Sequence, residues 1–109
     1  MPMTFNATRD ETQAEQPGGA ADSLRRVVFV LNEQGLHARP AAKLAQEAQK
    51  YEAEIRIVSG GVTVDAKSIL DVLTLAAGNG ASLELAAAGP DAAEALESLA
   101  KLFKERFQI

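Results

Sequence analysis

Cysteine is absent from the 109-residue sequence, and histidine occurs only once. The lack of cysteine excludes a disulfide framework and any cysteine-based zinc site, and it fits a reducing compartment. A single histidine also falls short of the three or four ligands that zinc requires. No apolar run approaches the roughly 20 residues that span a bilayer. We therefore expect no metal, no other cofactor, no membrane segment and a cytoplasmic location.

Concentrated positive charge is also missing. Residues 1–23 carry one arginine against four acidic side chains, and residues 24–109 carry ten basic and eleven acidic ones. Because nucleic-acid binders gather basic residues into a patch, nucleic acid is not an expected partner. The first segment lacks hydrophobic periodicity and has no basic stretch followed by an apolar one, which argues against a secretory signal. The sequence predicts a disordered acidic tail over residues 1–23 and one folded domain over residues 24–109.

Four segments have the composition or alternation of strands with one buried face. β-Branched and aromatic residues fill residues 25–32. Residues 53–66 are predicted to form two short strands joined by a turn at Ser59-Gly60-Gly61. Residues 81–89 alternate as a fourth strand.

Three segments have apolar residues at helical spacing. The first covers residues 38–50, and the second runs from residue 68 to a stop at Gly78. The third starts at Asp91, which resembles a capping box with Glu94. The apolar positions assigned to the core are Ala41, Leu44, Ala45 and Ala48 in the first helix, Val72, Leu75 and Ala76 in the second, and Ala92, Leu96, Leu99, Ala100, Phe103 and Phe107 in the third. This βαββαβα order predicts a two-layer α+β domain: a four-stranded antiparallel sheet with three helices on one face and water on the other.

The single histidine lies in the stretch "GLHARP", residues 35–40. Pro40 marks the first turn of a helix, so His37 lies just before it. The first amides of that helix lack internal acceptors, and the macrodipole adds about half a positive charge, so this end favours an anion. Arg39 adds a guanidinium that can bind two phosphate oxygens, and Gly35 lets the loop approach closely.

A histidine at this position has more than one interpretation. The plainest is a helix cap or a surface residue. A neutral imidazole is also a nucleophile near neutral pH, and a phosphoryl group on His37 would be a dianion held by Arg39 and the helix amides. No Gly-x-x-x-x-Gly-Lys-Ser/Thr loop offers a nucleotide site, and no motif suggests the nucleophile elbow of a hydrolase. The residues by themselves leave a cap and a phosphoryl acceptor both open.

The stretches "GLHARPAAKLAQEA" and "AKSILDVLTLAAG" resemble the histidine-containing phosphocarrier (HPr) family of the bacterial phosphotransferase system, and the resemblance covers about residues 25–104. It implies the open-faced β-sandwich of that family. It also implies a stoichiometric phosphoryl carrier, not an enzyme with turnover of its own. His37 would accept the phosphoryl group through Nδ1, and Arg39 would stabilise it. Ala38 and Pro40 would form the helix start at the site.

The resemblance also implies partners. Phosphorylated enzyme I, charged from phosphoenolpyruvate, would be the donor of the phosphoryl group, and a histidine of an enzyme IIA would receive it. The carrier itself would be a monomer. In the second helix Ile69, Leu70 and Leu73 cannot all be buried, and an exposed apolar patch usually marks a binding surface. These residues, with Lys43 and Lys67, would dock onto both partners.

Ser68 has two interpretations. As a helix N-cap it needs no further explanation, and in the family the equivalent serine is regulatory, the target of a serine kinase and its phosphatase. Asp71, Gln46 and Gln49 stand where lysine is frequent in sugar-type members, so sugar-type and nitrogen-type assignments both stay open. The alternative function is a regulatory binding module of the same fold that acts by contact and is switched at Ser68. The complete motif of residues 37–40 argues against it, because a pure binder has no need of that loop.

Overall fold

The computed structural model describes residues 23–108 of the chain. Its elements are β2 (Leu24–Phe29), α1 (Ala38–Ala48), β3 (Glu54–Ser59), β4 (Val62–Asp65), α2 (Ile69–Thr74), β5 (Ser82–Ala88), α3 (Ala92–Lys104) and the 3₁₀ turn η2 (Arg106–Gln108). The predicted order of strands and helices is confirmed. The acidic tail predicted over residues 1–23 lies, apart from Ser23, outside the described residues.

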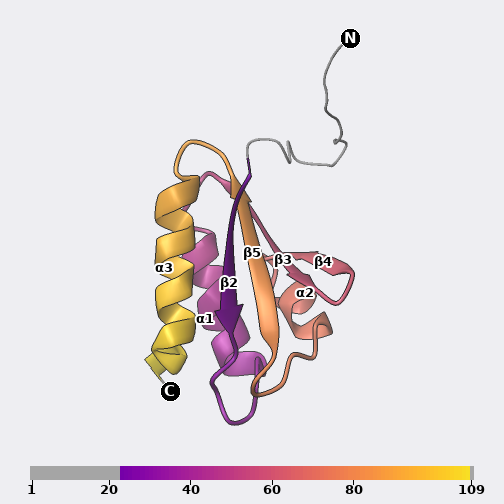
Figure 1. Ribbon diagram of the computed structural model, residues 1–109. Helices are drawn as coiled ribbons and strands as arrows, with labels where there is room; N and C mark the ends of the chain where they lie inside the picture. The colour runs from indigo at the N-terminus through magenta and orange to yellow at the C-terminus, as the bar shows by residue number, and fades with distance from the viewer. Residues whose placement is uncertain (1–22, 109) are drawn as a thin grey trace.

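Within the described range the strands form one four-stranded sheet in the order β2-β5-β3-β4, and all neighbours are antiparallel. The register sets buried side chains opposite one another. Val28 pairs with Leu83, and Leu85 pairs with Ile57, which in turn pairs with Val64. The helices pack against this apolar face (Figure 1). Two layers follow directly from strands that alternate and helices that are apolar on one side.

The other face of the sheet is open, as predicted. On β2 the side chains of Val27 and Phe29 point away from the helices and are 56% and 54% exposed. Beside them the Arg25 guanidinium pairs with the Glu84 carboxylate across β2 and β5, at 2.8 Å. Such exposed pairs contribute little stability, so the fold depends on the covered face.

The apolar stripe predicted for the last helix lies in the core. All six of its members are buried: Ala92, Leu96, Leu99, Ala100, Phe103 and Phe107. Phe103 and Phe107 pack edge to face with ring centroids 5.0 Å apart. Phe107 lies beyond the end of α3, so this aromatic contact ties the C-terminal turn η2 back onto the helix.

The end of the second helix differs from the prediction. α2 stops at Thr74, and Ala76 already has a positive φ of 49° and is exposed, so Gly78 does not close the helix and Ala76 is not part of the core. Val72 is buried as predicted, Leu75 is partly buried against the core, and Ala77 is buried where Ala76 was expected. The early end of α2 results from a tertiary contact: the Ala77 carbonyl accepts the Leu36 N–H at 2.9 Å. A bond to the loop that precedes α1 replaces the last turn of α2.

The capping box predicted at the start of the last helix is wrong. The Asp91 side chain makes no cap hydrogen bond to α3. Its carboxylate accepts the backbone N–H groups of Glu52 and Ala53, at 2.9 and 2.8 Å. The hydrogen bond from Glu52, with that from Ala53, lowers the pKa of Asp91 below its ordinary value. Asp91 therefore links the start of α3 to the loop before β3.

Replacing Asp91 with asparagine should lower the free energy of unfolding near neutral pH, because asparagine has a single acceptor oxygen: one of the two N–H groups loses its acceptor, and the other meets an uncharged one. A carboxylate whose pKa is lowered by folding adds stability above its unfolded pKa, about 3.8, and loses that contribution as the pH falls through the folded value. The difference in the free energy of unfolding between wild type and Asp91→Asn should therefore begin to narrow as the pH falls below about 3.8. Urea unfolding between pH 7 and pH 2.5 measures it, and Glu94→Gln on an exposed side chain of the same turn is the control. A gap independent of pH would contradict the assignment.

Candidate functional site

The loop between β2 and α1 is fixed by backbone hydrogen bonds on both sides. The Gly35 N–H donates to the Asn32 carbonyl at 3.0 Å, and the Leu36 N–H donates to the Ala77 carbonyl. Gly35 has a φ of +74°, which glycine adopts without the steric cost that other residues meet. The Leu36 side chain is buried beside this turn. These contacts hold the residue that follows, His37, at the start of α1.

His37 occupies the N-cap position of α1. Its carbonyl accepts the Ala41 N–H at 3.0 Å, but its imidazole makes no capping hydrogen bond to the helix. The ring is partly exposed, Ala38 and Arg39 are exposed, and Pro40 is buried. The His37 carbonyl therefore accepts the first hydrogen bond of the helix, and the imidazole is left available to solvent and to a reactant.

His37 and Arg39 open onto one pocket of about 640 Å³. The other residues that line it are Leu31, Asn32, Glu33, Gln34, Asn79 and Arg106. Among residues 23–108 neither the Arg39 nor the Arg106 guanidinium has an ion-pair partner, whereas Arg25, Arg26 and Arg56 each have one. Two unpaired guanidinium groups against the one carboxylate of Glu33 make the pocket suited to an anion.

Asn32 connects the floor of this pocket to the C-terminus. Its side chain is 7% exposed, and its Nδ2 donates to the Arg106 carbonyl at 3.0 Å. The Asn32 carbonyl accepts Asn79 Nδ2 at 3.1 Å. Asn32 Oδ1 is buried and has no hydrogen-bond partner. Sequence reasoning missed Asn32, Asn79 and Arg106, because no pattern relates them to His37 along the chain.

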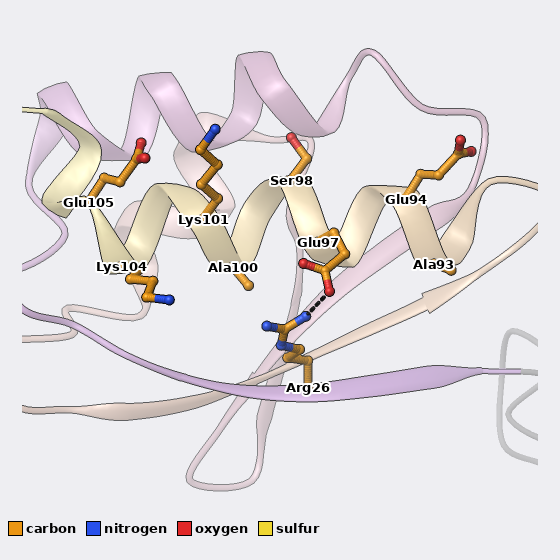
Figure 2. A pocket seen from close by; sticks show the side chains of 9 residues that line it. All are labelled: Arg26, Ala93, Glu94, Glu97, Ser98, Ala100, Lys101, Lys104 and Glu105. Atoms are coloured by element: carbon orange, nitrogen blue, oxygen red, sulfur yellow. Dashed lines mark hydrogen bonds and ion pairs between the residues drawn. The ribbon is translucent and has the colours of Figure 1, made fainter.

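A second hollow, of about 960 Å³, lies along α3. Figure 2 shows its lining, where the Arg26 guanidinium pairs with the Glu97 carboxylate at 2.8 Å. The exposed α3 residues Lys101 and Lys104 also line it. It contains neither His37 nor Arg39, and the Ser98 hydroxyl that lines it donates to the Glu47 carboxylate. The two residues that the sequence singled out for phosphoryl chemistry, His37 and Arg39, instead share the pocket at the start of α1.

The second helix begins as a capped helix. Ser68 is its N-cap, and Ser68 Oγ accepts the Asp71 N–H at 3.2 Å. The Asp71 carboxylate accepts the Asp65 N–H, also at 3.2 Å, which binds the first turn of α2 to the end of β4. Ser68 thus has a structural use whether or not it is ever modified.

The apolar residues singled out on this helix differ in exposure. Leu70 is 75% exposed and Ile69 is 38% exposed, while Leu73 is partly buried against the core. The two lysines assigned with them both donate to backbone carbonyls: Lys67 Nζ to Tyr51 at 2.7 Å and Lys43 Nζ to Phe107 at 3.0 Å. Docking by these lysines stays a prediction.

Residues 23–108 hold no group of three or more His, Cys, Asp or Glu side chains that could bind a metal ion. No helix in this part of the chain is both long and apolar enough to cross a membrane.

Comparison with known proteins connects this geometry to a family. The family model described as the PTS HPr component phosphorylation site matches residues 24–105. The phosphocarrier protein HPr of Treponema pallidum is 43% identical over 83 residues, which cover 76% of this chain and 94% of that protein. The phosphocarrier protein NPr of Shewanella violacea is 42% identical over 84 residues, 77% of this chain and 92% of that protein.

A solved structure gives the same answer for the fold. The crystal structure of the phosphocarrier protein HPr from Bacillus anthracis superposes with a TM-score of 0.72 at 43% identity, covering 74% of this chain and 96% of that chain. The open-faced arrangement of four strands and three helices is therefore the HPr fold. With the family match over residues 24–105, it follows that this chain belongs to the HPr family of phosphocarrier proteins of the phosphotransferase system.

Proposed function

We propose that the chain, acting as a monomer in the cytoplasm, takes a phosphoryl group onto His37 from phosphorylated enzyme I and passes it to a histidine of an enzyme IIA. Phosphoenolpyruvate would charge enzyme I. The observation that supports this most directly is the His37 imidazole at the N-cap of α1. It makes no capping bond and opens onto a pocket with two unpaired guanidinium groups.

The transfer needs no base in this chain. The lone pair of His37 Nδ1 attacks the phosphorus of the donor phosphohistidine, and the donor's N–P bond breaks with its electron pair returning to the donor ring, which carries a proton on its other nitrogen and so leaves as a neutral imidazole. The proton on His37 Nε2 stays in place. Onward transfer reverses the roles, so the carrier is regenerated without consuming anything itself. Positioning and charge stabilisation supply the catalysis.

Several groups would stabilise the phosphohistidine. Its phosphoryl oxygens would lie at the N-terminus of α1, where free amides and the helix dipole favour negative charge. Arg39, exposed in the first turn, can bind two of those oxygens at once. The buried Pro40 has no N–H to leave unpaired at the helix start, and the small exposed Ala38 leaves the approach to His37 open.

The partner-docking surface in this proposal is the exposed side of α2, formed by Ile69, Leu70 and Leu73. α2 packs against α1, whose N-terminus carries His37, so a partner that covers α2 can also reach the imidazole. Serine kinase and phosphatase action at Ser68 belongs to the same proposal. A phosphate there would add about two negative charges beside Leu70 and the Asp71 carboxylate.

Replacing Leu70 with aspartate should slow phosphorylation by enzyme I about tenfold at limiting donor, because an exposed apolar anchor is lost and a charge enters the interface. The endpoint of phosphorylation should stay that of wild type, since His37 is unchanged. Initial rates from quenched samples measure the effect. Val27→Asp, on an apolar residue that is also more than half exposed but lies on the open face of the sheet, is the control and should react at the normal rate. Equal rates for both variants would remove α2 from the docking surface.

The proposed function is tested by intact-mass analysis after incubation with phosphoenolpyruvate and a panel of sugar-type and nitrogen-type enzyme I proteins. An acid-labile gain of one phosphoryl group that maps to His37 is expected, and the enzyme I that supports it identifies the branch. Addition of an enzyme IIA should remove the group. A folded protein that gains nothing from any donor would instead support a module that acts by contact alone.

A further inference from the structure

The C-terminal turn η2 holds a backbone conformation that its residues disfavour. Arg106, Phe107 and Gln108 have φ values of 54°, 56° and 57°, and none of them is glycine. The left-handed region brings Cβ close to the neighbouring carbonyl, so three successive residues in it require support from the rest of the fold. The contacts that support this turn therefore indicate which side chain the turn holds in place.

Three contacts hold the turn, and two of them come from distant parts of the chain. The fully buried Phe107 ring packs against Phe103. The Arg106 carbonyl accepts Asn32 Nδ2, and the Phe107 carbonyl accepts Lys43 Nζ, both at 3.0 Å. Asn32 belongs to the loop before His37, and Lys43 belongs to α1. The turn is therefore fixed to the same two segments that position His37.

The result places a second arginine at the site. Arg106 lines the pocket of His37 and Arg39, and it has no ion-pair partner among residues 23–108. A phosphoryl group has three terminal oxygens and close to two negative charges, more than one bidentate guanidinium can satisfy. Glycine would fit the backbone at position 106 with less strain, so the side chain needs another reason to be there.

We infer that Arg106 binds the phosphoryl group on His37 together with Arg39, and that Asn32 and Lys43 position it by holding the carbonyls of the turn. This inference rests on the proposed function. It adds to it a second anion-binding residue, supplied from the other end of the domain. Arg106 then stabilises the phosphorylated state of the carrier itself, independently of any partner.

The test is an exchange at equilibrium. Phosphorylated wild type is mixed with an equal amount of unphosphorylated Arg106→Gln and a trace of the enzyme I that served wild type, and the two forms are separated by mass. Enzyme I only equilibrates them, so the final distribution reports the stability of each phosphohistidine and not docking. Arg106→Gln should hold about threefold to tenfold less phosphate than wild type. Lys104→Gln removes a neighbouring positive charge that does not line the pocket and should share the phosphate equally.

Arg106→Gly separates binding from folding. It should melt at or above the wild-type temperature, because the left-handed strain at this position is relieved, and yet show the same loss of phosphate. Arg106→Lys should recover part of the loss. An equal distribution of phosphate between wild type and Arg106→Gln would overturn the inference and leave the proposed function intact. If only the rate of exchange changed, the inference would also fail, and Arg106 would be assigned to contact with the partner. Failure of wild type to accept phosphate would instead overturn the proposed function, and the inference with it.

Discussion

Replacing His37 with alanine is expected to abolish phosphoryl uptake altogether, under conditions that phosphorylate wild type completely. The chain contains no other histidine, so no second imidazole can accept the group as an acid-labile phosphoramidate. The loss should be complete and not partial, because the guanidinium groups and helix amides only stabilise a bond that His37 has to form. Intact mass after incubation with phosphoenolpyruvate and enzyme I measures it.

The fold should survive this change. The hydrogen bond that His37 contributes to the helix is made by its carbonyl, which accepts the Ala41 N–H, and any residue supplies that group. A change of about 0.5 kcal/mol or less in the free energy of unfolding is expected from the imidazole. His37→Asn is the matched control, because asparagine is a favoured N-cap and should give a protein at least as stable that still takes up nothing. An acid-labile mass gain in either variant would refute His37 as the acceptor.

The parts of this fold that sequence reasoning predicted are those that repeat with a short period. Leu83, Leu85 and Ala87 alternate along β5 and all face the core, because a strand turns every second side chain to the same side. Burial of Leu99 and Phe103 on α3 follows in the same way from the spacing of a helix. The loop from Gly35 to Pro40 was predictable for a different reason, since glycine permits the left-handed backbone of a tight turn and proline fixes φ in the first turn of a helix.

What could not be predicted depends on contacts between distant segments. Asp91 and Glu94 have the spacing of a capping box, but two N–H groups from the loop before β3 compete for the same carboxylate and bind it. The chain leaves α2 early, and the Ala77 carbonyl then accepts the Leu36 N–H. Arg106 reaches the His37 pocket only because Phe107 is buried beside it. In the first two cases a tertiary hydrogen bond forms where a local one was expected, and in the third a buried ring places its neighbour; no local pattern reveals any of these contacts.

Gly35→Ala is expected to have the largest effect of any single methyl group added to the site. A Cβ at Gly35 would lie 2.4 Å from the Ala77 carbonyl oxygen and 2.9 Å from the Gly78 Cα. Both are backbone atoms, so no side chain can rotate away. The φ of +74° adds a conformational cost, and the hydrogen bond from Leu36 to Ala77 would have to lengthen or break. Together these effects should lower the free energy of unfolding by about 3 kcal/mol.

The other glycines separate these causes. Gly60 also has a positive φ, of 54°, but a Cβ there would meet no atom within 4 Å, so Gly60→Ala should carry the conformational cost alone, about 1 kcal/mol. At Gly78 the φ is not positive and the space is open, so alanine should be tolerated. In thermal unfolding, the melting temperature of Gly35→Ala should lie far below that of Gly60→Ala, which in turn should lie below that of Gly78→Ala. The backbone that the new Cβ would displace directly precedes His37 in the chain. Gly35→Ala should therefore also accept phosphate more slowly, even at temperatures where it is folded. If it unfolds no earlier than Gly60→Ala, the close packing of this loop against the end of α2 does not exist, and the positioning of His37 must have another source.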